Sequence, residues 1–136
     1  MPKSIFDNLV LPPVAVLLGW SLVAINPQEG TIEVAFDGRP EFANPTGHIQ
    51  GGLLAAMLDD TLGPALFAMT EGREFGTTID LHTHFLRPVP VGPITTKGRV
   101  TRKGRSVAFM EGQLFDGAGN LAARATGSAF LSDFQA

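Results

Sequence analysis

The stretch from Asn44 to Asp60 holds residues whose types and spacing could do chemistry. Gly51 and Gly52 stand where a polar loop gives way to an apolar run with helical spacing. The first N–H groups of a helix have no partner within it, and they lie at the positive end of the helix dipole. Because glycine lets a ligand approach the backbone closely, this junction could stabilise a developing oxyanion.

Asp59 is the candidate for acid–base chemistry in the same stretch. It lies two turns after Gly51, about 80° around the helix axis at roughly 100° per residue. A carboxylate within an apolar run either satisfies backbone amides or takes part in chemistry. Asp60 is the neighbouring alternative, so the spacing alone leaves two carboxylates open.

The composition limits the chemistry that the chain can use. Its 136 residues include no cysteine, which excludes a thiolate nucleophile, a disulfide scaffold, cysteine-bound zinc and an Fe–S cluster. The sequence also contains no G-x-S-x-G motif and no dinucleotide or Walker glycine pattern. Catalysis must therefore use carboxylate, imidazole, hydroxyl or backbone amide groups.

Charge and hydropathy narrow the class of protein. The net charge of −3 lacks the basic excess of a nucleic-acid-binding protein. Only 17% of the residues are charged, against about 25% in ordinary domains, which indicates surface that is buried again in an oligomer. No run reaches the roughly 18 apolar residues of a membrane span, and the apolar run 14–24 lacks the flanks of a signal peptide. We therefore expect a cytoplasmic protein with no membrane or nucleic-acid partner.

Hydrophobic periodicity predicts two helices. A proline pair and Gly19 bound a short N-terminal helix within residues 12–19, since proline is favoured at helix starts and glycine at helix ends. A stripe of leucine and methionine at helical spacing predicts a long central helix over Gly51–Thr70. Pro64 inside this helix should kink it or end its first half.

The remaining apolar runs predict about six strands. They cover Trp20–Asn26, Thr31–Asp37, Thr77–Arg87, Pro93–Thr101, Ser106–Phe115 and Asn120–Leu131. Residues 27–30, 88–92, 102–105 and 116–119 are short, turn-rich links, so we interpret them as hairpins of an antiparallel sheet. One long helix against such a sheet predicts an α+β fold, in a single domain over residues 1–136.

The motif around the glycine pair matches a known pattern. The sequence resembles, over nearly its whole length, the PaaI-like branch of the hotdog-fold acyl-CoA thioesterases. That family's central pattern is an Asn, a Gly, then His-Gly-Gly and an acidic residue nine positions after the His. This chain has Asn44, Gly47, Gln50-Gly51-Gly52 and Asp59 at that spacing, and segments within 76–88 match the family's next strand.

The resemblance implies a fold and a mechanism. The hotdog fold wraps an antiparallel sheet of about six strands around one central helix. In the family pattern, the Gly51 amide polarises the thioester carbonyl, and Asn44 helps to bind that carbonyl or to place water. Asp59 acts as general base or nucleophile, and Thr78 orients the water. The family's site is shared between two subunits, so the resemblance implies a homodimer, or a homotetramer built as a dimer of dimers.

One position departs from the family pattern. The His of His-Gly-Gly is Gln50 here, and glutamine cannot titrate near neutral pH. We assign Gln50 and Gly52 to substrate binding rather than to proton transfer. His48, two residues earlier, is open as a substitute or as a plain loop residue.

Two further clusters are candidate binding sites. Arg102, Lys103 and Arg105 form a basic turn that could hold the phosphates of CoA, or could be a solvated hairpin turn. The alternation of Asp80, His82 and His84 puts the three side chains on one face of a strand, and we interpret them as strand surface rather than as a metal site.

We therefore predict an enzyme that hydrolyses acyl-CoA, including aryl-acyl-CoA, to free acid and CoA. It needs no metal and no cofactor, because CoA is part of the substrate. A non-catalytic acyl-CoA-binding hotdog module is the alternative, followed by a hotdog dehydratase and a monomeric lipid-binding fold.

Overall fold

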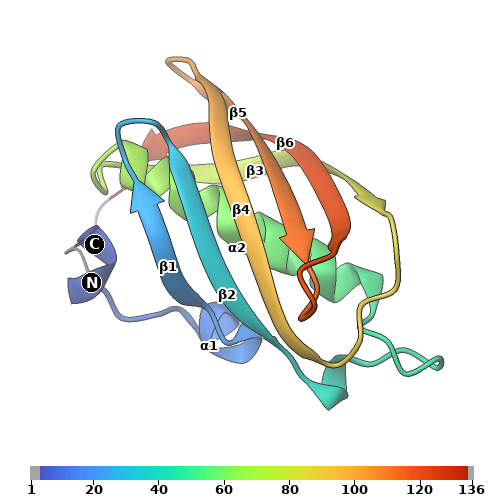
Figure 1. Ribbon diagram of the computed structural model, residues 1–136. Helices are drawn as coiled ribbons and strands as arrows, with labels where there is room; N and C mark the ends of the chain where they lie inside the picture. The colour runs from blue at the N-terminus through green and yellow to red at the C-terminus, as the bar shows by residue number, and fades with distance from the viewer. Residues whose placement is uncertain (1–3, 135–136) are drawn as a thin grey trace.

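A long helix, α2 (Gly51–Met69), lies against one face of a six-stranded sheet in the computed structural model, which describes residues 4–134 (Figure 1). The strand order is β1-β2-β4-β5-β6-β3, and every neighbouring pair is antiparallel. The predicted α+β architecture is therefore confirmed. In chain order the other elements are η1 (Ile5–Asn8), α1 (Pro13–Leu18), β1 (Ser21–Asn26), β2 (Thr31–Gly38), η2 (Pro40–Phe42), β3 (Glu74–Phe85), β4 (Gly92–Lys103), β5 (Val107–Phe115) and β6 (Leu121–Asp133).

The link between β3 and β4 is not the predicted hairpin. β3 pairs with β6 at the edge of the sheet, and β5 and β6 separate it from β4. The link instead packs on the loop that precedes α2. Val89 is buried there, its carbonyl accepts the Ile49 N–H at 2.9 Å, and Pro90 pairs with His48 as an isolated bridge. The other side of β3 has no strand beside it within residues 4–134.

The helix α2 passes through Pro64 without ending, contrary to one of the outcomes expected from the sequence. Proline has no N–H, so the carbonyl of Asp60, four residues earlier, loses its helical donor. The indole Nε1–H of Trp20 donates to this carbonyl at 2.8 Å instead. A side chain from outside the helix thus replaces the missing hydrogen bond, and the helix continues to Met69.

The apolar stripe of α2 is the centre of the core. Met57, Leu58, Leu62 and Leu66 are buried against the sheet. Among the described helices, α2 alone is long and apolar enough to cross a membrane by length and composition, and this burial marks it as a core helix.

Glycines let the middle of the sheet come close to α2. Gly98 of β4 and Gly112 of β5 are register partners. A Cβ built at Gly98 would lie 3.0 Å from Thr61 Cγ2 and 3.1 Å from Leu62 Cδ2, and one at Gly112 would lie 3.2 Å from Leu62 Cδ2. The contact therefore excludes larger side chains at these two strand positions.

A buried polar contact fixes the position of α2 along the same strands. The Thr61 hydroxyl donates to the Met57 carbonyl at 2.7 Å, and Thr96 of β4 lies 2.6 Å from the Thr61 oxygen. Since Thr61 has one proton, Thr96 is the donor in the second bond. Both side chains are fully buried, so a shift of the helix would leave polar groups unpaired.

The close contact at Gly98 predicts the result of adding one methyl group. Gly98→Ala should lower the free energy of unfolding by about 1–3 kcal/mol, because three side chains crowd the new Cβ. Gly63→Ala is the matched control, because a Cβ at Gly63 would meet nothing within 4 Å and alanine favours helix. Urea unfolding at one protein concentration measures both, and equal stability of the two variants would contradict the packing argument.

Candidate active site

The structure brings Asp59 and Thr78 together. The Thr78 hydroxyl donates to Asp59 Oδ1 at 2.7 Å, and both side chains are exposed. A β-bulge between Thr78 and Asp80 turns Thr78 toward α2, opposite the buried Ala129 of β6. A carboxylate that accepts a hydroxyl hydrogen bond keeps a second oxygen for a water molecule. Asp59 and Thr78 are called the carboxylate half-site below.

Gly51 begins α2 with its amide pointing out of the helix. The N–H groups of Leu53 and Leu54 donate to the Gln50 carbonyl at 2.9 and 3.3 Å. The amides of Gly51 and Gly52 have no acceptor within the described chain. A Cβ at Gly51 would lie 3.4 Å from Phe85 Cζ, so the ring of Phe85 covers this end of the helix.

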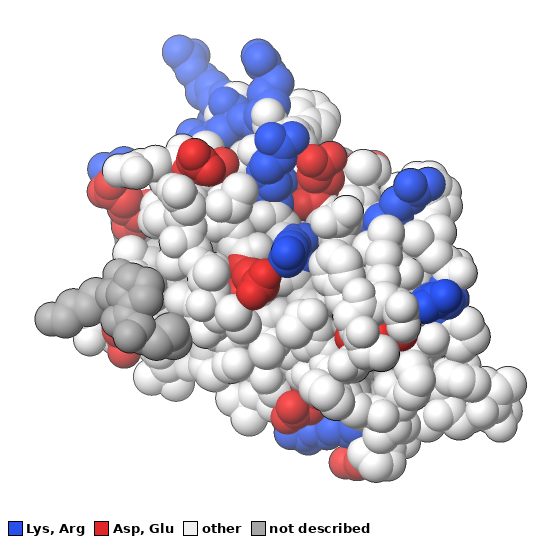
Figure 2. Space-filling view, viewed as in Figure 1, with Lys and Arg blue, Asp and Glu red and all other residues white. Residues whose placement is uncertain are grey.

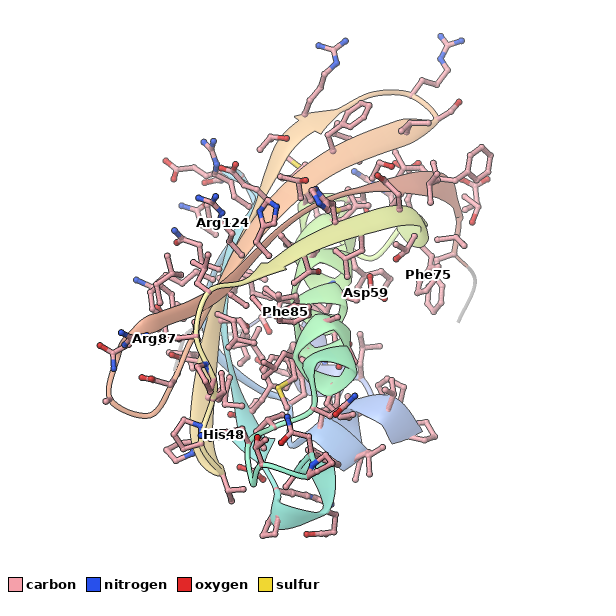
Figure 3. The ribbon with its side chains drawn as sticks, turned by 90° about the vertical axis from the view of Figure 1, so that its right-hand side faces the viewer. His48, Asp59, Phe75, Phe85, Arg87 and Arg124 are labelled. Atoms are coloured by element: carbon pink, nitrogen blue, oxygen red, sulfur yellow. The ribbon has the colours of Figure 1, made fainter. Side chains whose placement is uncertain are left out.

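Asn44 borders the same space as Gly51. A cavity of about 400 Å³ is lined by both residues and also by His48, Phe85 and Arg87. Figure 3 shows His48 near the end of α2 that Gly51 begins, with Asp59 farther along the helix beside β3. Asn44 and Gly51 are called the amide half-site below.

The two half-sites of one chain are far apart. Gly51 and Asp59 are eight residues apart on α2, which is about 12 Å along the axis at about 1.5 Å per residue. A carbonyl must lie about 3 Å from both the oxyanion donor and the attacking group. One chain therefore does not bring the amide and the carboxylate to the same reacting carbon.

The predicted substrate-binding residues at the start of α2 are exposed. Gln50 is the N-cap residue, and its side chain makes no capping hydrogen bond. A Cβ at Gly52 would meet nothing within 4 Å. Packing among residues 4–134 therefore does not require a glycine at position 52.

The basic turn joins β4 to β5 at the end of the sheet where β3 starts. Figure 2 shows Lys and Arg side chains projecting from the tip of this hairpin. Lys103 pairs with Glu74 at 3.1 Å, which ties the turn to the start of β3, and leaves Arg102 and Arg105 exposed. At about 3.3 Å per residue, Glu74 lies about 13 Å from Thr78 along β3.

Asp80, His82 and His84 do not form a metal site in the described chain. Asp80 accepts a hydrogen bond from Ser128, and the rings of His82 and His84 pack at a centroid distance of 4.6 Å. No group of three potential metal ligands occurs within residues 4–134. A hollow of about 830 Å³ lies on this outer face of the sheet and is lined by both histidines, away from the half-sites.

Asp60 is the unusual carboxylate in the structure, although the sequence offered it only as an alternative to Asp59. Its Oδ2 is buried and has no hydrogen-bond partner among the described residues. Burial, and then the charge of Asp59, raises the pKa of the Asp60 carboxyl from 3.8 to about 6. Pro64 is the sequence signal that could have revealed the burial of Asp60. Because Pro64 has no N–H, the Asp60 carbonyl accepts from the Trp20 indole, which packs against this turn of α2.

The raised pKa of Asp60 predicts a pH-dependent effect of one substitution. The folded state binds this proton more tightly than the unfolded chain, so the contribution of Asp60 to wild-type stability falls as the pH rises from 3.8 to about 6 and then stays level. Asp60→Asn removes this loss, and its melting temperature should exceed that of the wild type at pH 8. The difference should shrink as the pH falls through 6. Asp133→Asn, on an exposed carboxyl, is the control, and a difference that does not depend on pH would contradict the assignment.

Comparison with known proteins identifies the family. The model of the thioesterase superfamily matches residues 46–123, which include Gly51, Asp59 and Thr78. The chain belongs to this family. It is 33% identical over 107 residues to a protein of Saccharolobus solfataricus named "Putative esterase", covering 79% of this chain and 76% of that one.

Solved structures agree with this membership. A phenylacetic acid degradation-related protein of Ralstonia eutropha has a TM-score of 0.87 and 33% identity, covering 93% of this chain and 95% of that one. A Streptococcus mutans protein solved with acetyl CoA has a TM-score of 0.76 at 17% identity, covering 86% of this chain and 91% of that one, and shares the fold. The resemblance to hotdog-fold thioesterases is thus confirmed, and thioester hydrolysis is the activity of the superfamily.

Proposed function

We propose that this thioesterase hydrolyses acyl-CoA at a site shared between two subunits. The observation that carries the proposal is the hydrogen bond from Thr78 to Asp59 at the open edge of the sheet. Thr78 holds one carboxylate oxygen, so the other is available to take a proton from water. The base in this mechanism is Asp59, because its carboxylate is exposed and held by Thr78, whereas Asp60 has a buried oxygen.

The reaction then proceeds in two steps. Water gives its proton to Asp59 while its oxygen attacks the thioester carbonyl carbon, and the carbonyl oxygen becomes an oxyanion bound by the Gly51 N–H and Asn44. When the carbonyl re-forms, the C–S bond breaks and CoA leaves as thiolate. A thiolate leaves without prior protonation, so Gln50 in place of a histidine does not prevent turnover. No step uses a metal or a further cofactor.

The separation of the half-sites supports a dimeric site. The amide half-site of one subunit can face the carboxylate half-site of another only if two copies meet near β3. That edge strand leaves its outer backbone groups without a strand partner in the described chain, and Phe75, Ile79 and Phe85 expose at least half of their side chains. Pairing of β3 with its copy would cover this edge.

The basic turn supports CoA as the leaving group. Arg102 and Arg105 lie on the subunit that supplies Asp59, in a turn that Lys103 ties to the start of β3, where they could contact phosphates. Acetyl CoA in the Streptococcus mutans protein of the same fold agrees with this ligand class. Gln50 in the family's histidine position leaves room for one alternative, an acyl-CoA-binding module without turnover, and Asp59 at the catalytic spacing argues against it.

The proposal predicts release of CoA thiol from a panel of acetyl-, hexanoyl- and benzoyl-CoA. Asp59→Asn should lower kcat at least about 100-fold, because it removes the base, while binding is retained. Asp133→Asn should leave kcat unchanged. Thiol release measures turnover, and calorimetry with the Asp59→Asn variant measures binding. Binding by the wild type without thiol release would instead identify the non-catalytic module.

Removal of one N–H tests the oxyanion site. Proline fits the first position of a helix, and Gln50 before it has ψ 133°, within the range that the residue before a proline favours. Gly51→Pro therefore removes the proposed donor with little change of backbone. It should lower kcat about 10²–10³-fold, whereas Gly51→Ala keeps the N–H and most of the activity.

The same variant tests whether the site is shared. A heterodimer of a Gly51→Pro subunit and an Asp59→Asn subunit has one site with both defects and one site with neither. Purified by two different tags, it should recover about half of the wild-type activity per dimer. If the heterodimer is as inactive as both parents, the site lies within one chain.

A further inference from the structure

The loop before α2, residues 43–49, holds Asn44 at the cavity that Gly51 also lines. Its two ends pair as an antiparallel bridge, and the Asn44 N–H donates to the His48 carbonyl at 2.6 Å. The Gly47 N–H donates to the Asn44 carbonyl at 2.9 Å, with Gly47 at φ 83°, a value that favours glycine. The backbone of this loop is thus closed on itself, and the side chain of Asn44 lies over its turn.

Three donors orient the carboxamide of Asn44. Its Oδ1 accepts from the Thr46 N–H at 3.0 Å, the Thr46 hydroxyl at 2.7 Å and the His48 N–H at 3.2 Å. A backbone N–H can only donate, so the end of the carboxamide that meets these groups must be the oxygen. The Nδ2 end is left with two N–H donors that no residue within 4–134 accepts.

The hydrogen-bond chain continues to the imidazole of His48. The Thr46 hydroxyl has one proton, and the acceptor-only Oδ1 of Asn44 takes it. The Thr46 oxygen lies 3.1 Å from His48 Nδ1 and must accept there. His48 is therefore the Nδ1–H tautomer, and its ring fixes the rotation of the Thr46 hydroxyl.

We propose that Thr46, held by His48, is a positioning residue that points Nδ2 of Asn44 at the thioester carbonyl. The inference rests on the proposed function, because it assigns a task within that site. A carboxamide free to rotate could present its oxygen, which would repel the oxyanion, whereas the loop allows only the donor end. His48 thus has a task that requires no proton transfer, in a chain where Gln50 stands in the family's histidine position.

The hydrogen bonds that join Asn44, Thr46 and His48 lie at the exposed surface, so their loss should not unfold the protein. Thr46→Val removes the hydroxyl and keeps the shape and the backbone N–H, and Thr46→Ser is the matched control that keeps the hydroxyl. On the best substrate among acetyl-, hexanoyl- and benzoyl-CoA, Thr46→Val should lower kcat about tenfold with KM within about twofold. Thr46→Ser should stay within about twofold of wild type in both.

A double-mutant cycle separates positioning from a general structural role. In an Asn44→Ala background, Thr46→Val should cost no further activity, because the residue it acts through is gone. Two results would overturn the proposal: wild-type kcat in Thr46→Val, or an equal loss in the Asn44→Ala background.

A separate readout distinguishes failure of the proposed function. If the wild type releases no CoA from the panel, or Asp59→Asn retains turnover, the proposed function fails on its own terms. The ¹⁵N spectrum of the His48 ring still decides the hydrogen-bond chain. An Nδ1–H tautomer that shifts toward Nε2–H in Thr46→Val supports it, and an Nε2–H tautomer in the wild type overturns it.

Discussion

The contact between α2 and the glycine pair in the middle of the sheet is the constraint on which the rest of the molecule depends. Leu62 can reach Gly98 and Gly112 only because neither strand residue has a side chain. The buried Thr61–Thr96 hydrogen bond then fixes how far along its axis the helix lies. These two contacts fix the distance of α2 from the sheet and its position along its own axis. Gly51, Asp59 and Asp60 therefore have fixed positions relative to β3.

This placement divides the chemistry into two halves. The helix presents an unpaired amide at its start and a carboxylate two turns later, and the rigid helix keeps them about 12 Å apart. A flexible loop could bring such groups together within one chain, but a buried helix cannot bend to do so. The fold thus favours a site that is completed by a second copy, and it leaves β3, which carries Thr78, at the edge where a second copy could meet it.

The sequence predicted the helices and strands well because their periodicity is strong and their ends carry proline and glycine. The order of the strands was harder to predict from the sequence, because short turn-rich links suggest hairpins. The link between β3 and β4 instead packs on the loop before α2 through the buried Val89, and this contact has no sequence pattern of its own. Strict alternation would also place Thr78 on the same face as Asp80. The β-bulge between Thr78 and Asp80, which the sequence pattern does not predict, turns Thr78 toward Asp59.

The bond from Trp20 to the helix has a consequence for how this protein can be observed. Trp20 is the chain's one tryptophan, and its indole docks at the gap that Pro64 opens, with Phe6 of η1 packed beside it at a centroid distance of 5.3 Å. Its fluorescence is therefore an intrinsic reporter of two events at once, the docking of the N-terminal segment and the integrity of the helix midpoint. Because the Asp60 carboxyl belongs to the same turn, the emission spectrum should also register its charge without any introduced label.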